Sequence, residues 1–250
     1  MMRFTTTISL AVLVTTWMVA SHFAQSDAFP GPFAVSQKIL QESINGELWI
    51  HLGATFGRVL VAFGFAWVIG LAIGAALGRS DVLDRWFWPW VNIFLNMPAL
   101  VVIVICYLGL GMTEIAAILA VVINKAPLIA VNVRDGVRQF ESKYEEFASI
   151  YRLSWRQKIC LIWLPQLEPF LFTALRTGLS LTWKIILVVE LLGRSSGVGF
   201  QIHLYFQLFE VDMILAYALS FMIAMQLIEW SIVRPLERHV QRWRKDGQMA

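Results

Sequence analysis

Few side chains of this chain have the types and spacing that enzyme chemistry requires. No HExxH or GxSxG motif occurs, and Cys106 and Cys160 have no CxxC or Cys/His spacing. The GxxxxGK[ST] phosphate loop is also absent from the sequence, and no lysine follows a glycine. The histidines are scattered, at His22, His51, His203 and His239. We therefore expect no catalytic residue, no metal site and no ATP hydrolysis by this chain itself.

Ionisable residues within long apolar runs are the remaining candidates, because a membrane makes them costly unless they face protein, water or an interface. Arg176, Trp183 and Glu190 are seven residues apart, so on a helix they share one face, with Ser180 between them. This face is a candidate lining for a translocation pathway. Alternatively, Arg176 and Glu229 lie near the cytoplasmic surface and snorkel to it, and Glu190 pairs locally near the outer end. The full set is Arg58, Lys125, Arg176, Lys184, Glu190 and Glu229.

Lys184 is the residue for which the sequence suggests contact with a substrate. An ammonium deep in an apolar run would favour an anion such as a sulfonate or nitrate, although it could equally neutralise a carboxylate from another helix. The pathway-lining candidates are therefore Ser180, Trp183, Lys184 and Glu190.

The composition indicates which elements must position these residues. Of the 250 residues, 58% are hydrophobic and only 15% are charged, and the mean hydropathy of +0.66 is far from that of soluble proteins. The net charge of +3 is small, and no basic face interleaved with aromatics occurs, which argues against nucleic-acid binding. We expect an all-α integral membrane protein.

Six apolar runs are long enough to cross a membrane, since a crossing helix needs about 20 residues. The first could instead be a signal peptide, but it leads into a Pro-Gly-Pro turn at 30–32 and not into a clean cleavage site. In the second, Gly70, Gly74 and Gly78 recur every four residues and predict close packing against another helix. The predicted spans are 6–24, 52–78, 87–110, 113–133, 168–193 and 211–233.

Lysines and arginines near the span ends predict the orientation, because such residues are retained on the cytoplasmic side. With the amino terminus inside, only Lys38 and Arg194 lie on the outer side, so both termini are expected in the cytoplasm. The loops are then an external connection at 25–48 with a short helix after Pro32, a cytoplasmic loop at 138–166 and a cytoplasmic tail at 234–250. The cytoplasmic cations are Arg3, Arg79, Arg85, Arg134, Arg138, Lys143, Arg152, Arg156, Lys158, Arg234, Arg238, Arg242, Arg244 and Lys245.

The cytoplasmic segment at 145–165 has the pattern of a docking element. Among charged residues it carries apolar ridges, with Phe147, Ile150 and Tyr151 on one short helix. A helix with an exposed apolar ridge suits a groove on a partner protein. Alternatively, the segment packs against the cytoplasmic ends of the spans. Leu164-Pro165 is expected to end its helical pattern before the fifth span.

This segment resembles the cytoplasmic EAA loop of membrane subunits of ATP-driven importers of the ABC type. That pattern is Glu-Ala-Ala, a Gly at the sixth position after the Glu, and Leu-Pro at the eighteenth and nineteenth. Glu146 and Ala148 fit the opening, and Leu164-Pro165 arrives at the expected spacing. Phe147 replaces an Ala and Arg152 replaces the Gly, so the detailed shape of the turn is open to question.

The resemblance extends over nearly the whole chain and is closest to the permeases of nitrate, sulfonate and taurine importers. Its further traces are HLGATFGRVLVAFGFAWVIGLAIGAALG from His51, the Pro98-Ala99-Leu100 turn, GLGMTE from Gly109, PLIAVNVRDGV from Pro127, LRTGLSLTW from Leu175, GVGFQI from Gly197 and PLERHVQRW near the end.

The resemblance implies one permease domain, 1–250, in a bacterial inner membrane, passing a small, anionic solute. It also implies the partners: membrane lipid, a second permease copy, an extracytoplasmic solute-binding protein and a cytoplasmic ATPase dimer that holds ATP and Mg. The loop residues that would meet the ATPase are Glu145, Glu146, Phe147, Ala148, Tyr151, Arg152, Ser154, Leu164 and Pro165.

Two other classes of protein remain open. An autonomous secondary transporter or channel would show inverted repeats and broken helices with paired intramembrane ions, and the sequence shows neither clearly. A membrane-embedded enzyme would need convergent chemistry, which the scattered histidines do not supply.

Overall fold

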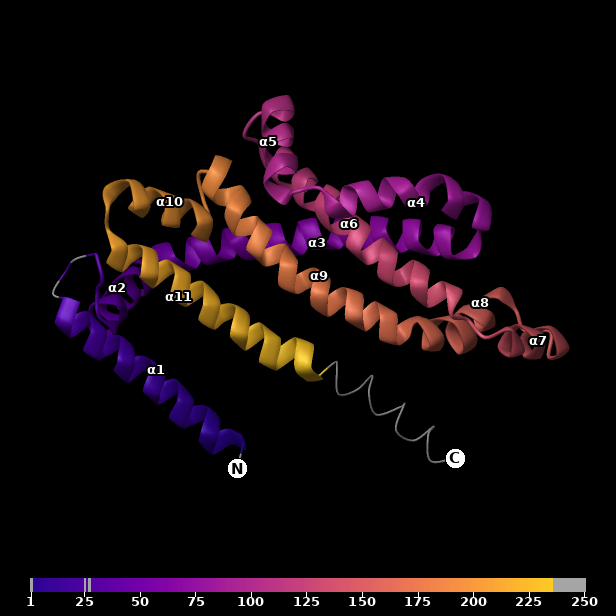
Figure 1. Ribbon diagram of the computed structural model, residues 1–250, viewed down its shortest axis with the longest axis horizontal. Helices are drawn as coiled ribbons and strands as arrows, with labels where there is room; N and C mark the ends of the chain where they lie inside the picture. The colour runs from indigo at the N-terminus through magenta and orange to yellow at the C-terminus, as the bar shows by residue number, and fades with distance from the viewer. Residues whose placement is uncertain (1, 25, 27, 236–250) are drawn as a thin grey trace. The chain divides into compact units, whose positions relative to one another are not determined.

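The computed structural model describes residues 2–24, 26 and 28–235. Within those residues the chain is helical and holds no strand, as the all-α prediction requires. Most of the predicted tail, 236–250, lies outside the described residues. The helices, drawn in Figure 1, are α1 (Met2–Ala24), α2 (Pro32–Asn45), α3 (Glu47–Arg79), α4 (Asp81–Asn96), α5 (Ala99–Leu110), α6 (Glu114–Arg138), α7 (Ser142–Ile150), α8 (Trp155–Lys158), α9 (Leu164–Gly193), α10 (Val198–Leu208) and α11 (Val211–Ile228).

The chain falls into two compact units. Unit 1 comprises residues 1–56 and 189–227, and unit 2 comprises residues 57–188 and 228–250. Because α3 and α9 cross the boundaries, each unit joins segments that are far apart in the sequence.

Four helical segments of the described chain are individually long and apolar enough to cross a membrane: Thr5–Ala24, Glu47–Arg79, Glu114–Arg138 and Val211–Ser231. Two further helix pairs meet the same criteria only together. The α4–α5 pair is bent by 95°, and the pair formed by Trp155–Gly193 and α10 is bent by 49°. The described chain therefore supports four spans, or up to six if each bent pair is one span.

The span predicted at 87–110 is not one continuous helix. α4 ends at Asn96 and α5 begins at Ala99, with Pro98 between them. Proline has no N–H and excludes the preceding residue from helical conformations. Met97 accordingly has an extended conformation, with φ −70° and ψ 128°. No charged residue interrupts 87–110, so hydropathy alone does not reveal the break.

The expectation that Leu164-Pro165 ends a helix is also wrong. The helix continues from Trp155 to Gly193 through a π-helical turn at Ile159–Trp163. In this turn the N–H of Leu164 donates to the carbonyl of Ile159, five residues earlier. A wider turn accommodates Pro165, which has no N–H and whose ring would clash with the turn before it.

Unit 2 has its core between α3 and α6. A Cβ atom added at Gly70 would lie 2.6 Å from the Cβ of Ile129, and Gly74 and Gly78 are equally close to the next two valines of α6, Val133 and Val137. The structure thus places all three predicted packing glycines against α6, one turn apart. Small residues let the two backbones approach closely, which is how helices associate where no hydrophobic effect drives them together.

Unit 1 joins the amino-terminal helices to α10 and α11. The predicted short helix after Pro32 is present as α2, and its Val35 is buried. The hydroxyl of Tyr217 in α11 donates to Glu42 of α2 at 2.6 Å, and the indole N–H of Trp17 in α1 donates to the carbonyl of Pro30 at 3.1 Å. These bonds attach α2 to α11 and the end of α1 to the turn before α2.

Candidate functional site

The loop at 138–166, called here the coupling segment after the resemblance, presents an apolar surface on α7. Phe147 and Tyr151 are 50% and 65% exposed, and their rings are tilted by 35° with centroids 4.3 Å apart. Ile150 beside them is also exposed, whereas Ala148 is fully buried on the opposite side. α7 is therefore anchored by one face and offers the other to a partner.

The turn after α7 keeps the geometry that a glycine would supply, although Arg152 occupies it. Arg152 has a φ of +50°, in the left-handed region that non-glycine residues rarely adopt. The N–H of Leu153 donates to the carbonyl of Ala148 at 3.0 Å, and the N–H of Arg152 donates to that of Ser149 at 3.2 Å. These two bonds form a Schellman motif, in which Arg152 is the residue just past the helix end.

Arg152→Gly should tighten this turn. Relief of the left-handed conformation is expected to stabilise the helix end by about 1 kcal/mol. Amide hydrogen exchange in peptides covering 148–153 should then slow by roughly fivefold.

Phe209 is a matched control for Arg152, because it also has a positive φ, of +60°, after α10. Phe209→Gly should protect the Glu210 amide, which donates to Tyr205, and leave α7 unchanged. Unaltered amide exchange in both variants would show that the positive φ of Arg152 and Phe209 does not destabilise these helix ends.

α8 begins with a capping box. The hydroxyl of Ser154 accepts from the N–H of Gln157, and the side chain of Gln157 accepts from the N–H of Ser154 at 2.8 Å. This reciprocal pair satisfies two of the otherwise unpaired donors at a helix start. Ser154, predicted to meet an ATPase, is thus a residue that starts α8. Leu164 and Pro165 are exposed at the beginning of α9.

Arg79 attaches the coupling segment to the end of α3. Its guanidinium lies 4.1 Å from the ring centroid of Trp163 and 5.7 Å from that of Trp155. The two indoles meet edge to face, 4.6 Å apart. A cation over an aromatic face contributes about 0.5–2 kcal/mol, depending on desolvation. These three side chains line a hollow of about 250 Å³ with Ala75, Val137, Phe140, Ile159, Leu164 and Leu167.

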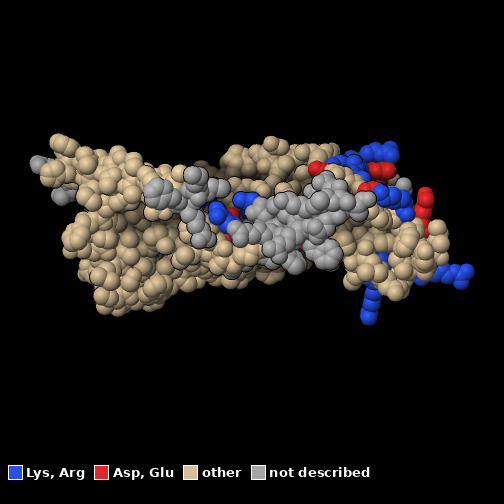
Figure 2. All heavy atoms as spheres, turned by 90° about the horizontal axis from the view of Figure 1, so that it is seen from below, with Lys and Arg blue, Asp and Glu red and all other residues tan. Residues whose placement is uncertain are grey.

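Charges gather around the coupling segment. Figure 2 shows Lys, Arg, Asp and Glu concentrated at the end of unit 2 that carries α7 and α8. Lys143 pairs with Glu141, whose hydrogen bond and negative charge raise the pKa of the Lys143 ammonium. Glu146 is exposed, and the side chain of Glu145 lies outside the described residues.

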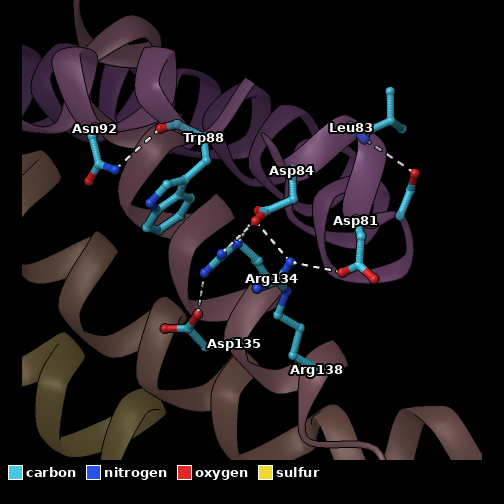
Figure 3. A network of polar contacts seen from close by, with 9 residues as sticks. Asp81, Leu83, Asp84, Trp88, Asn92, Arg134, Asp135 and Arg138 are labelled. Carbon is cyan, nitrogen blue, oxygen red and sulfur yellow. Dashed lines mark hydrogen bonds and ion pairs between the residues drawn. The ribbon is translucent and has the colours of Figure 1, made fainter. Parts of the chain in front are cut away.

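A charged network joins α4 to α6 (Figure 3). Arg134 donates to both carboxylate oxygens of Asp84, one of them at 2.8 Å, and its guanidinium lies 3.7 Å from the ring centroid of Trp88. Arg138 lies 2.8 Å from the same carboxylate, and Asp135 accepts from Arg134 at 3.0 Å. Asp84 is buried, so this network fixes α4 on α6 through a desolvated bidentate pair.

In unit 1, Glu190 is fully buried in a hydrogen-bonded cluster. Its carboxylate accepts from the hydroxyl of Thr55 and from the N–H of Gly199, both at 2.9 Å. The hydroxyl of Thr55 in turn accepts from the N–H of Val198 at 2.8 Å. Val198 and Gly199 form the first turn of α10, where a negative charge is favourable. The carboxylate therefore holds the start of α10 against α3.

His51 completes this cluster. Its Nδ1 accepts from the N–H of Gly197 at 3.0 Å, so a neutral ring carries its hydrogen on Nε2. Nε2 lies 2.5 Å from the side-chain amide of Gln201 and 3.6 Å from a carboxylate oxygen of Glu47. The cluster contains no nucleophile beside the histidine other than Thr55, whose hydroxyl is already engaged with Glu190 and Val198. Its geometry is suited to holding helices together.

The four pathway candidates lie in different environments. Ser180 and Trp183 are partly buried and Lys184 is exposed, all on the unit 2 part of α9. Glu190 has the local pairing that the sequence offered as an alternative. Arg176 lies 3.8 Å from Glu229, the other residue of that alternative. Pathway lining by Ser180, Trp183, Lys184 and Glu190 stays a prediction.

The chain matches a known family of transport proteins. The family described as binding-protein-dependent transport system inner membrane component matches residues 66–242, more than half of the chain. The chain belongs to this family. It is a permease subunit of the ABC importer class, and the resemblance carried by the coupling segment is confirmed.

Individual relatives agree with the family. The permease is 28% identical to the putative aliphatic sulfonates transport permease protein SsuC of Bacillus subtilis (strain 168), over 94% of this chain and 85% of that protein. It is 27% identical to the taurine transport system permease protein TauC of Escherichia coli (strain K12), over 96% and 90%. A nitrate import permease protein NrtB of Synechocystis is 28% identical over 78% and 74%.

The fold has solved counterparts. A chain of the MetNI methionine ABC transporter in an inward-facing conformation superposes with a TM-score of 0.65 at 21% identity, covering 78% of the permease and 98% of that chain. A chain of an amino acid ABC transporter with histidines gives 0.61 at 14% identity, covering 82% and 96%. At these identities the likeness concerns the fold alone.

Proposed function

We propose that this permease forms the translocation pathway of an ATP-driven importer for a small anionic solute of the sulfonate, taurine or nitrate type. The relatives at 27–28% identity support this solute class by their names. Its partners would be a second copy of the permease, an extracytoplasmic solute-binding protein, membrane lipid and a separate ATPase dimer that holds ATP and Mg. Residues 1–250 would act as one domain in the bacterial inner membrane, with both termini in the cytoplasm.

The observation that carries the proposal is the apolar face of α7. Phe147, Ile150 and Tyr151 are exposed on a charged segment. In the proposed orientation this segment lies in the cytoplasm, where lipid would not cover them. A groove on the ATPase would bury them and give α7 a defined seat.

The same segment offers a route for movement. If the ATPase moved α7, the turn at Arg152 would transmit the movement to α8. Arg79, at the end of α3, contacts Trp155 and Trp163, so α3 would move with α8. α3 and α6 are packed at van der Waals distance along three turns, so they would move as one body.

Copurification with the ATPase tests the docking. We expect Phe147→Asp to weaken the association at least tenfold, because it places a carboxylate in an apolar contact, and Glu146→Arg to weaken it by reversing the charge beside that contact. Phe209→Asp is the matched control, since Phe209 is an exposed phenylalanine after α10 in unit 1 and should leave the association unchanged. Undiminished association of both coupling-segment variants would argue against docking through this loop.

A further inference from the structure

Lys125 is a buried cation at the centre of a span. It follows the start of α6 by 11 residues and precedes the end by 13, since α6 runs from Glu114 to Arg138. Lys125 is only 7% exposed. Val121 and Ile129, one turn away on either side, are completely buried. An ammonium in such a place is among the costliest groups a membrane protein can carry.

Other buried ionisable residues in the described spans have partners. Arg58 makes a bidentate pair with Glu114, at 2.9 and 2.8 Å, and the carboxylate of Glu190 accepts two hydrogen bonds. Asp84 is held by Arg134. The side-chain ammonium of Lys125 has no hydrogen bond or ion pair to any residue that the structure describes.

Snorkelling does not relieve this lysine. Long cationic side chains reach the membrane interface from positions near helix ends. Lys125 is at least 11 residues, or roughly 16 Å at 1.5 Å per residue, from either end of α6. Its ammonium therefore stays at the depth of the hydrocarbon core.

The neighbouring residue touches the broken helix pair. The side-chain amide of Asn124 lies 3.5 Å from the carbonyl of Met97, where α4 ends and α5 begins at an angle of 95°. Irregular backbone at membrane depth is tolerated where protein buries it or where it lines a water-filled cavity. Lys125 follows Asn124 in the sequence, and its side chain leaves α6 about 100° around the helix from the amide that meets this polar backbone.

We propose that Lys125 is a specificity-determining residue whose ammonium pairs with the transported anion. The missing counter-charge of this lysine is then supplied by the solute, a sulfonate or a small oxyanion. The inference rests on the proposed function for the charge of the solute. Lys184, the candidate for substrate contact from the sequence, is exposed on α9 and stays a separate prediction.

The test combines stability and uptake in the complex of permease, ATPase and binding protein. Lys125→Met should leave the complex intact and its melting temperature equal or higher, because an unpaired buried charge is removed. Uptake of taurine, ethanesulfonate or nitrate, whichever the wild type imports, should fall at least tenfold, and Lys125→Arg should recover a substantial part. Lys38→Met is the control for the same change outside the spans, where Lys38 pairs with Asp212 at 3.5 Å.

Two results would overturn the role of Lys125 alone. One is unchanged uptake by Lys125→Met with unchanged selectivity among the three anions. The other is a lower melting temperature for Lys125→Met, which would mean that the ammonium has a structural partner. Failure of the wild type to import any of the three anions would refute the proposed solute class, and the role of Lys125 with it.

Discussion

Gly197→Ala should strongly destabilise the permease. Gly197 has φ 107° and ψ 168°, a conformation open almost only to glycine, which costs an alanine about 1–3 kcal/mol. The added Cβ would also lie closer than 3.0 Å to both carboxylate oxygens of Glu190, which is fully buried. Displacing such a group costs a further 1–3 kcal/mol or so. We expect a loss of about 4 kcal/mol, measured as a lower melting temperature in detergent.

Gly46 provides the control for Gly197. It also has a positive φ, of 88°, at the end of α2, but an added Cβ would meet nothing within 4 Å. Gly46→Ala should therefore lower the stability of the permease only through the strain of a positive φ, by about 1 kcal/mol. Equal losses in the two variants would show that contact with Glu190 contributes nothing.

Asp84→Asn should separate α4 from α6. The amide keeps the shape of the carboxylate but removes the negative charge that pairs with Arg134 and Arg138. Removing one partner of a buried pair typically costs about 3 kcal/mol or more. Asp135 still pairs with Arg134 in this variant, so we expect a loss near the lower end of that range. The melting temperature of the purified permease should fall accordingly.

Asp135→Asn is the matched control for Asp84→Asn. Asp135 binds the same Arg134, but its side chain is 48% exposed, against 11% for that of Asp84. Exposed ion pairs contribute roughly 0–1 kcal/mol, so this variant should melt close to the wild type. A similar fall in both variants would contradict the assignment of the stabilisation to burial.

Much of the fold follows from local patterns in the sequence. Apolar runs of span length account for α3, α6 and α11, and the ridge of α7 follows from the spacing of Phe147, Ile150 and Tyr151. The break at Pro98 was also present as a local signal, since proline restricts Met97. The predicted span nevertheless ran from 87 to 110 across the Pro98-Ala99-Leu100 turn, because the whole run is apolar. A proline within an apolar run should therefore be read as a possible helix boundary.

The turn at Arg152 shows a limit of motif comparison. Replacement of the expected glycine by arginine suggests a different turn, yet the two backbone bonds of the Schellman motif hold Arg152 at a positive φ. The backbone geometry persists because the bonds to Ala148 and Ser149 outweigh the strain at one residue. The departure from the motif therefore changes the surface of the segment and not its path.

The buried clusters could not be predicted from spacing. Thr55, Glu190 and Gly199 come from three helices, and only the topology brings them together. Likewise, the sequence does not show which of the ionisable residues Arg58, Lys125 and Glu190 has a partner. The fold distinguishes them, because it gives partners to Arg58 and Glu190 and none within the described chain to Lys125.

The central claim, that this chain is the membrane half of an ATP-driven importer, is tested most directly by uptake into sealed vesicles. The permease would be reconstituted alone, with its ATPase, and with ATPase and binding protein, and labelled taurine, ethanesulfonate and nitrate would be offered with and without ATP. We predict uptake only when ATPase, binding protein and ATP are all present. Uptake by the permease alone, without an ATPase, would contradict the account and indicate an autonomous transporter or channel.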